Sequence, residues 1–194
     1  MATKALDHDM ATKDKMIPFG ILNLENDQLH VFYGQSYKTS DFICDALEQW
    51  WESVKEDYQH IDELVIYADN GSENNSRRTW VLLRLVGFAR KAGLKIHLVY
   101  YPPYHSKYNP IERSWAFLEK HWGGALLNTV TTVLEWTKSM RWRCVKPIVS
   151  LLDRVYEKGL SLRKSGMAKI QPYILRNLEL KKWDVTIVPK LVSS

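Results

Sequence analysis

Several features are absent from this sequence, and each absence narrows the class of protein. No apolar run approaches the roughly 18 residues that a membrane span requires. No basic segment followed by an apolar stretch and a small-residue cleavage site opens the chain. The two cysteines, Cys44 and Cys144, have no metal-ligand spacing around them, so we interpret both as reduced structural thiols. We therefore expect a soluble cytoplasmic protein without a structural disulfide or zinc site.

Repeats and low-complexity tracts are also absent, which leaves an ordinary globular composition. The 194 residues are 45% hydrophobic, which is enough for one core and too short for two full-sized domains. The net charge of +5 is unevenly spread: residues 141–194 contain 12 Lys and Arg against 4 Asp and Glu, and residues 1–140 contain 15 against 18. This asymmetry indicates a polyanionic partner for the C-terminal part, although basic helix faces in contact with water explain it equally well.

Apolar spacing along the chain predicts alternating strands and helices. Two short apolar runs, at residues 17–23 and 29–33, flank a polar tetrapeptide and indicate a β-hairpin. The pattern that follows predicts a helix capped by Thr39 or Ser40, a buried strand at 64–68, a helix that stops at Gly93, a strand at 96–101 and a helix that starts at Asn109. Helices are expected to cover a mixed sheet, so the predicted fold class is α/β.

Residues 125–194 differ from the preceding part of the chain. Their pattern is helical and basic, with breaks at Pro147, Gly159 and Pro172, and it ends in the strand-like run DVTIV. We therefore divide the chain into a core at residues 1–124 and a basic, mainly helical extension at residues 125–194 that packs on this core.

Two carboxylates stand where predicted strands give way to loops. Asp69 ends one strand, and Glu112 opens the helix that follows the next strand. If these strands are neighbours, both side chains lie over the same sheet edge, where functional groups of α/β folds gather. Magnesium prefers sparse oxygen ligation of this kind, and a pair of such ions supports in-line phosphodiester displacement. Each residue alone also has a structural explanation, because Asp69-Asn70-Gly71 is a common turn signal and Glu112 completes a capping box after Asn109.

Longer motifs resemble bacterial insertion-sequence transposases. The stretch YADNGSEN is similar to the strand and turn that carry the second aspartate of the retroviral-integrase-like superfamily. In YYPPYHSKYNPIERSWAFLEKHW, an aromatic-Pro-Pro loop leads through Asn-Pro-Ile-Glu to what resembles the third carboxylate. The segments ALDHDM, PFGILN, GQSYKTSDF and MRWRCVKPIVSLLDRVYEKGLSL look like parts of one branch, the ISAzo-type Asp-Asp-Glu (DDE) transposases. The resemblance covers nearly the whole chain.

This resemblance implies a fold and a chemistry. It implies a ribonuclease-H-like mixed sheet flanked by helices, two Mg²⁺ or Mn²⁺ ions, and DNA cleavage followed by attack of a 3′ hydroxyl on target DNA. Carried over to this sequence, Asp69 is the second metal-binding carboxylate and Glu112 is the third. The implied partners are transposon ends and target DNA, with a homo-oligomer as a further expectation and no membrane partner. A bacterial, nucleoid-associated location is expected.

The first aspartate of the family has no clear counterpart in this sequence. It belongs on a central strand that we expect upstream of ALDHDM, and the helix-turn-helix region usual at the front of such transposases is not found either. Three accounts stay open: the downstream fragment of a decayed or split gene, the second reading frame of an element expressed by frameshifting, or replacement of the missing ligand by Asp7 or Asp9. A sheet that lacks its central strand is expected to have an edge prone to self-association.

Basic residues close to Glu112 and beyond it are candidates for DNA contacts. Lys107 and Arg113 flank Glu112 and would position phosphates, although both also suit an ordinary surface. The C-terminal part adds salt-sensitive candidates, namely Arg141, Arg143, Lys146, Arg163 and Lys164. The functions in competition are a transposase or its remnant, a catalytically dead DNA-binding or regulatory protein that kept the fold, and a metal-dependent nuclease without strand transfer.

Overall fold

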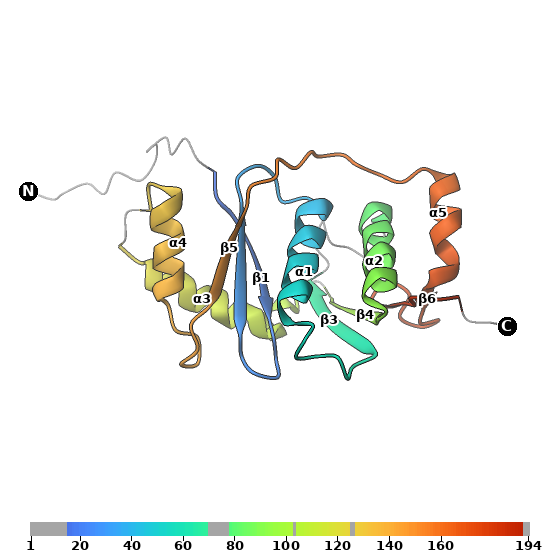
Figure 1. Cartoon of the computed structure of the whole chain (residues 1–194), viewed down its shortest axis with the longest axis horizontal. Coiled ribbons are helices and arrows are strands. Elements are labelled where there is room, and N and C mark those ends of the chain that lie inside the picture. Colours follow the sequence, from blue (N-terminus) through green and yellow to red (C-terminus); the bar gives the residue numbers. More distant parts are fainter. Residues whose placement is uncertain (1–14, 70–77, 103, 125–126, 192–194) are drawn as a thin grey trace, which may run out of the picture.

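Two separate β-sheets form the framework of the protein. The computed structural model describes residues 15–69, 78–102, 104–124 and 127–191 (Figure 1). The first sheet has the order β1-β2-β5, with β1 at Ile17–Leu22, β2 at Leu29–Gly34 and β5 at Ile148–Leu152. The second has the order β3-β4-β7-β6, with β3 at Glu63–Asp69, β4 at Lys95–Tyr101, β7 at Asp184–Ile187 and β6 at Ile174–Arg176. The predicted α/β class is confirmed, but the described strands form two mixed sheets instead of one.

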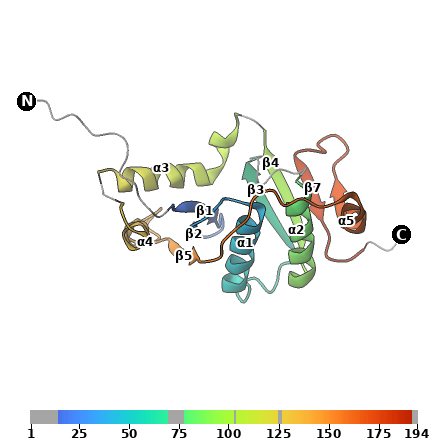
Figure 2. The ribbon, with the colours of Figure 1, turned by 90° about the horizontal axis from the view of Figure 1, so that it is seen from above.

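Helices cover the strands from two sides (Figure 2). On one side α1 (Ser40–Val54) packs against α2 (Thr79–Ala92), and α5 (Lys164–Ile170) packs against α2. On the other side α3 (Pro110–Trp122) contacts β1, and α4 (Val130–Ser139) contacts α3 and β5. Two short 3-10 helices, η1 and η2, span Ser106–Tyr108 and Gln171–Tyr173. Strand β1 therefore lies between α1 and α3.

Local turn chemistry explains the hairpin, which is confirmed. β1 and β2 pair antiparallel along their whole length. Asn23 Oδ1 accepts a hydrogen bond from the Glu25 amide, and Asn26 Oδ1 accepts one from the Gln28 amide, each at 3.0 Å. Asparagine side chains that bond to the backbone two residues on stabilise turns. The polar tetrapeptide between the apolar runs thus sets the register of both strands.

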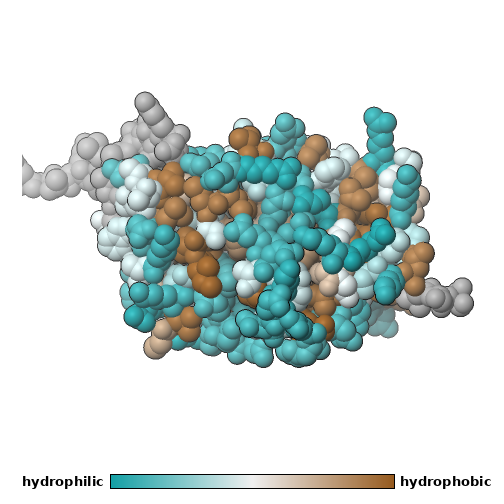
Figure 3. Space-filling model, viewed as in Figure 1, coloured by the Kyte–Doolittle hydropathy of each residue, from teal (hydrophilic) through white to brown (hydrophobic). Residues whose placement is uncertain are grey.

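The main core lies between α1, α2 and the second sheet. The predicted cap of α1 is Thr39, whose Oγ1 accepts a hydrogen bond from the Phe42 amide at 3.3 Å. The predicted stop of α2 is also confirmed, because Gly93 adopts φ 72°, a left-handed conformation that glycine adopts at no steric cost. The outer surface over α1 is mainly hydrophilic (Figure 3), so the apolar stripes of both helices face the strands. The buried residues of this core include Leu47, Trp50, Leu82, Leu85, Ile96 and Leu98.

Strand β3 is only partly covered, which corrects the prediction of a buried strand at residues 64–68. Its Ala68 is buried, but Val65 and Tyr67 are 42% and 48% exposed. The reason is topological. β3 pairs with β4 alone among the described strands, and no helix seals the face that carries Val65 and Tyr67.

The C-terminal part is less helical than predicted. The predicted strand in DVTIV is confirmed as β7, but β5 and β6 are strands where helix was expected. β5 pairs with β2 in parallel, and β6 pairs with β7 antiparallel. Residues 148–152 read IVSLL and follow a proline; Ile and Val favour strands, and this run pairs with the edge of β2. Strands from this part of the chain therefore extend both sheets.

The remaining general predictions concern thiols and membranes. Both cysteines are free, with Cys44 buried and Cys144 exposed. Burial raises the pKa of the Cys44 thiol to about 12, so this thiol stays protonated and acts as a small apolar core residue.

Among the helices that the structure describes, none is both long enough and apolar enough to cross a membrane.

Candidate active site

Asp69 lies at the carboxyl end of β3. β3 and β4 pair in parallel along their whole length, with Asp69 opposite Tyr101. Both strands therefore end at one edge of the sheet, and the loops that follow them leave from that edge. The Asp69 side chain is exposed. Residues 70–77, which follow it in the ADNGSENN stretch, lie outside the described residues.

Glu112 is held by the start of α3. Asn109 is buried, and its Oδ1 accepts a hydrogen bond from the Ile111 amide at 3.4 Å, which caps the helix as predicted. Pro110 takes the first helical position, where its missing N–H costs nothing. The structure records no hydrogen bond from the Glu112 carboxylate back to the Asn109 amide. The purely structural explanation of Glu112, a reciprocal capping box, therefore lacks its defining contact.

The two carboxylates line the same cavity. This cavity has a volume of about 770 Å³ and is bounded by β1, β3, α1 and α3. Burial raises the pKa of Glu112, and the negative charge of Asp69 raises it further, whereas the charge of Lys38 acts in the opposite direction. A like charge nearby disfavours the ionised form of Glu112. The structure thus brings Asp69 and Glu112 to one end of the cavity, although they come from different elements.

These residues suit a divalent cation, but they do not form a full cage. Within residues 15–69, 78–102, 104–124 and 127–191, no group of three or more His, Cys, Asp or Glu side chains is arranged to hold a metal ion. Magnesium needs only one or two protein carboxylates when water and substrate phosphate oxygens complete its shell. Because Asp69 and Glu112 repel each other, a cation between them would remove an unfavourable interaction. The pair therefore fits part of a metal site.

Comparison with known proteins decides the family. Residues 1–189 match the family described as the Rhodopirellula transposase DDE domain. The chain belongs to this family. The resemblance to DDE transposases seen in the sequence is thus confirmed. Searches of curated proteins and of solved structures each found no match. Membership implies DNA as a partner, and DDE transposases generally use divalent metal ions.

The alternative ligands for a DDE site remain predictions. Asp7 and Asp9, the candidate substitutes for the first carboxylate, lie outside the described residues, so their relation to Asp69 and Glu112 is not tested. The roles of Asp69 and Glu112 as metal ligands also stay predictions. What the geometry adds is that both side chains line one cavity at one sheet edge.

Sequence reasoning missed Lys38, which lies close to this DDE pair. Lys38 is exposed in the segment that joins β2 to α1, and it also lines the cavity. Its charge favours the ionised form of Glu112. The residue lies in the GQSYKTSDF segment, but a single lysine far from both carboxylates in sequence carries no local signal. Only the fold shows that it belongs to the site.

Two of the predicted DNA contacts lie near the same end of the protein. Lys107 is in η1 and Arg113 is in the first turn of α3, and both side chains are exposed. The Lys107 ammonium lies 5.1 Å from the centre of the Tyr108 ring, and Tyr104 and Tyr108 are themselves exposed. Cations interleaved with exposed aromatic rings suit the phosphates and bases of nucleic acid.

The other predicted DNA contacts lie elsewhere, so the basic C-terminal residues do not form one patch. Arg141, Arg143 and Lys146 lie in the segment between α4 and β5, where Arg143 makes an ion pair of 2.9 Å with Asp27 of the hairpin turn. Arg163 and Lys164 lie at the start of α5, at the opposite end of the protein from α4 (Figure 1). The +8 charge of residues 141–194 is therefore divided between two ends.

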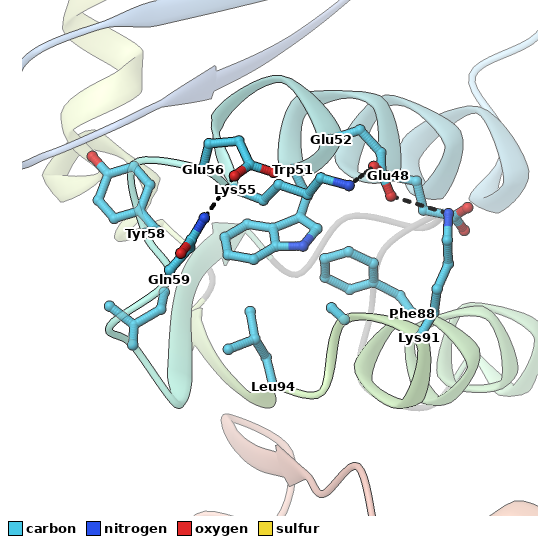
Figure 4. Close-up of a pocket in the computed structure, with 12 residues that line it drawn as sticks. Glu48, Trp51, Glu52, Lys55, Glu56, Tyr58, Gln59, Phe88, Lys91 and Leu94 are labelled. Carbon is cyan, nitrogen blue, oxygen red and sulfur yellow. Dashed lines mark hydrogen bonds and ion pairs between the residues drawn. The ribbon is translucent and has the colours of Figure 1, made fainter.

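A second cavity, of about 470 Å³, lies between the ends of α1 and α2 (Figure 4). Lys55 and Lys91 converge there on Glu52, at 2.5 and 3.2 Å, beside Trp51 and Phe88. Its lining includes neither Asp69 nor Glu112. Because its charges neutralise one another in exposed ion pairs, it is a weaker candidate for chemistry than the cavity at the strand edge.

Proposed function

We propose that this chain carries two of the metal-binding carboxylates of a transposase that cleaves and joins DNA strands by metal-dependent phosphodiester chemistry. One observation carries the proposal: Asp69 and Glu112 line the same cavity, where burial and the charge of Asp69 raise the pKa of Glu112. A carboxyl whose pKa is perturbed by burial and a nearby charge in a cleft is a common sign of a functional site. Membership of a DDE transposase family supports this reaction class.

The proposed mechanism assigns a task to each residue. Asp69 and Glu112 would hold Mg²⁺ or Mn²⁺ as part of a two-ion site, which activates the attacking oxygen and stabilises the leaving oxygen when bound. Without a cation, Glu112 keeps its proton to a higher pH than an ordinary glutamate, so cation binding and proton release are coupled. Lys38, Lys107 and Arg113 would contact phosphates and fix the register of the DNA backbone.

A complete site needs a third carboxylate beyond this pair. We propose that it comes from a central strand outside the described residues, as the ribonuclease-H-like fold implies, with Asp7 or Asp9 as the alternative source. The protein would act in the bacterial cytoplasm on transposon ends and target DNA, as part of a homo-oligomer. The remaining basic residues, Arg141, Arg143, Lys146, Arg163 and Lys164, would add salt-sensitive affinity for DNA.

Plasmid nicking tests the catalytic proposal. The full chain is incubated with Mn²⁺ and supercoiled plasmid, and nicked product is measured over time. Asp69→Asn and Glu112→Gln each remove one ligand and are expected to reduce nicking by roughly a hundredfold or more, because a misplacement of about 1 Å already costs that much. Glu135→Gln, on α4, exposed and outside the lining of the cavity, is the matched control and should retain activity.

A non-catalytic DNA-binding protein is the second candidate function. It is favoured by the finding that, among the described residues, no group of three or more His, Cys, Asp or Glu side chains is arranged to hold a metal ion. In that case the wild-type chain would not nick plasmid. It would still bind labelled DNA in a salt-dependent manner, and binding would survive both Asp69→Asn and Glu112→Gln. Joining of a labelled 3′ end to target DNA separates a transposase from a simple nuclease.

A further inference from the structure

The segment between β5 and α5 passes along the edge where the first sheet's parallel strands end. β5 pairs with β2 in parallel, and its last residue, Leu152, lies opposite Gly34, the last residue of β2. Residues 153–163, which we call the crossover segment, then run over the starts of α1 and α2 to reach α5 (Figure 1). The Leu162 amide donates to Thr79 Oγ1 in the first turn of α2 at 3.1 Å. The crossover segment therefore lies at the carboxyl ends of β2 and β5.

Buried contacts fix the middle of the crossover segment above the loop between β2 and α1. Tyr156 is buried, and its ring packs edge-on against Phe42, with 5.4 Å between the ring centres. Its hydroxyl donates to Asp45 at 3.1 Å, and its amide donates to Ser36 Oγ at 2.9 Å. The residues next to Tyr156 in sequence are thereby held over the loop that contains Tyr37 and Lys38.

Two lysines contact the ring of Tyr37, and a third follows it in sequence. Lys158 Nζ lies 4.3 Å and Lys15 Nζ lies 5.5 Å from the centre of this ring, which belongs to a residue that is 43% exposed. Lys15 reaches this place because Ile17, at the start of β1, pairs with Gly34 at the end of β2. Lys38 is exposed and lines the cavity of Asp69 and Glu112. We call Lys15, Lys38 and Lys158 the lysine cluster.

No ion pair neutralises the lysine cluster within the part of the chain that the structure describes. The crossover segment contains two carboxylates, Asp153 and Glu157, but neither pairs with these lysines. Lys95, by contrast, forms an ion pair of 2.9 Å with Glu63. Two ammonium groups that share one ring repel each other, because a like charge nearby disfavours the charged form. An anion that contacts both would remove this unfavourable interaction.

The arrangement suits the backbone of DNA. DNA carries one charge about every 3.4 Å along each strand, and lysine contacts to phosphates fix the register of the backbone without reading its sequence. The lysine cluster offers several unpaired cations side by side, from the rim of the cavity to the crossover segment. Neighbouring phosphates of one strand can therefore each meet a cation, whereas one small anion would use only part of the cluster.

Strand direction separates the lysine cluster from the basic turn at residues 141–146. Ile148, the first residue of β5, lies opposite His30 near the start of β2, and Arg143 pairs with Asp27 in the hairpin turn. That turn is therefore at the amino ends of β2 and β5, whereas the lysine cluster is at their carboxyl ends. The five residues of β5 span roughly 15 Å at the rise of a strand. Only the lysine cluster extends to the cavity of Asp69 and Glu112.

We propose that Lys15 and Lys158 bind backbone phosphates of the DNA strand that enters the cavity of Asp69 and Glu112. They would hold phosphates next to the one at Lys38, and the ring of Tyr37 would position both ammonium groups. The inference deepens the proposed function and rests on it, because DNA is taken as the partner of the same site. It adds two phosphate contacts and one positioning residue from segments that lie far apart in sequence.

Salt-dependent DNA binding tests the two lysines. The Kd of the full chain for a fluorescein-labelled DNA duplex is measured at several salt concentrations without divalent ions, so that no strand is cut. Lys15→Gln and Lys158→Gln should each reduce the slope of log Kd against log salt by about 0.9, because each removes one phosphate contact. The double variant should bind about tenfold more weakly or worse near physiological salt.

Lys95→Gln is the matched control. It removes the same charge from an exposed lysine, but Lys95 is at the start of β4, opposite Glu63, whereas Asp69 and Tyr101 pair at the other end of these strands. Its slope should equal that of the wild type. Circular dichroism of each variant checks that the fold is kept, which is expected because all three lysines are exposed.

Two substitutions at Tyr37 test its positioning role. Tyr37→Phe keeps the aromatic face and should bind DNA as the wild type does, because the face of the ring attracts the cations. Tyr37→Leu keeps an apolar side chain of similar reach but removes the aromatic face, and it should weaken binding by about threefold or more. Rescue by phenylalanine but not by leucine separates positioning of the cations from simple packing.

Several results would overturn the inference. They are a wild-type salt slope in the double lysine variant, an equal loss of slope in Lys95→Gln, or absence of DNA binding by the wild type. Wild-type affinity of Tyr37→Leu would remove Tyr37 from the site. An equal loss in Lys95→Gln would mean that only the total charge of the protein matters.

The binding test is independent of the catalytic test, because it needs no divalent ion and no cleavage. Weaker DNA binding by the lysine variants without any nicking by the wild type would sustain the phosphate contacts and contradict the proposed chemistry. Nicking by the wild type together with unchanged DNA binding by the lysine variants would have the opposite meaning.

Discussion

The two sides of the second sheet are built from similar residues but differ in completeness. On one side β7 lies between β4 and β6, and its Val185 and Ile187 are fully buried. On the other side β3 has a partner on one edge only, and its Val65 and Tyr67 are exposed although they are apolar. The closed side fixes the fold, whereas the open side carries Asp69 and the cavity. The residues that stabilise the fold and the residues of the candidate site thus lie in different regions of one sheet.

A charge network joins α1 and α2, the two helices that cover the main core. Arg84 donates to Asp41, to Asp45 at 2.6 Å and to Glu48 at 2.9 Å, and Trp80 Nε1 also donates to Asp41. Burial alone would lower the pKa of Arg84, but hydrogen bonds to the three carboxylates outweigh it and raise this pKa. The guanidinium therefore stays charged, and it joins the two helices that cover the core.

Removing Arg84 should have the largest effect on stability. Arg84→Ala leaves three partly buried carboxylates facing one another, and it is expected to lower the free energy of unfolding by about 2 to 4 kcal/mol. Lys95→Ala is the control, because its ion pair with Glu63 at 2.9 Å is more exposed and should contribute less than about 1 kcal/mol. Urea denaturation measures both. Equal losses in the two variants would show that the network does not hold α1 and α2 together.

A matched pair of valine truncations compares the two sides directly. Val185→Ala in β7 removes two buried methyl groups and should cost about 2 kcal/mol. Val65→Ala in β3 removes exposed groups and should cost under about 1 kcal/mol. Equal costs would mean that the open side is already covered in solution.

Local chemistry explains which parts of this fold were predictable. Thr39, Gly93 and Asn109 were identified as helix boundaries because capping depends on side chains within a few residues. The strand at β5 was missed because its stability depends on β2, more than a hundred residues earlier. The exposure of Val65 was missed for a related reason: a continuous apolar run indicates covered faces, and the sequence of β3 does not reveal that one neighbour is missing.

The residues of the candidate site also fall into those that local sequence signals indicated and those that only the fold revealed. Asp69 and Glu112 stood out because each follows a strand signal within a long motif, and the parallel pairing of β3 and β4 was enough to place them at one edge. Lys38 belongs to a segment on the other side of the cavity, so no spacing along the chain indicated it. The basic residues were counted as one group by sequence position. The fold then separated them, because α4 and α5 lie at opposite ends.

The smallest expected effect concerns Glu112 and gives the sharpest test of the open side. Its pKa is raised in the folded chain by burial and by Asp69, so the folded state retains this proton to a higher pH than the unfolded state does. Stability contributed by the protonated carboxyl is fully present below the unfolded pKa and is lost as pH rises through the folded pKa. Glu112→Gln should therefore unfold at a slightly higher urea concentration than the wild type at pH 7, and this difference should vanish below about pH 4, near the usual glutamate pKa.

Divalent ions should make the wild type more stable than Glu112→Gln at pH 7. Because a cation that binds only the folded state stabilises it by mass action, Mn²⁺ should stabilise the wild type. The same ion should stabilise Glu112→Gln much less, because one anionic ligand is gone, while Glu135→Gln, outside the cavity lining, should respond as the wild type does. Equal stabilisation of all three proteins would show that the ion binds elsewhere. In that case Asp69 and Glu112 would be neighbours at an open strand edge without being metal ligands.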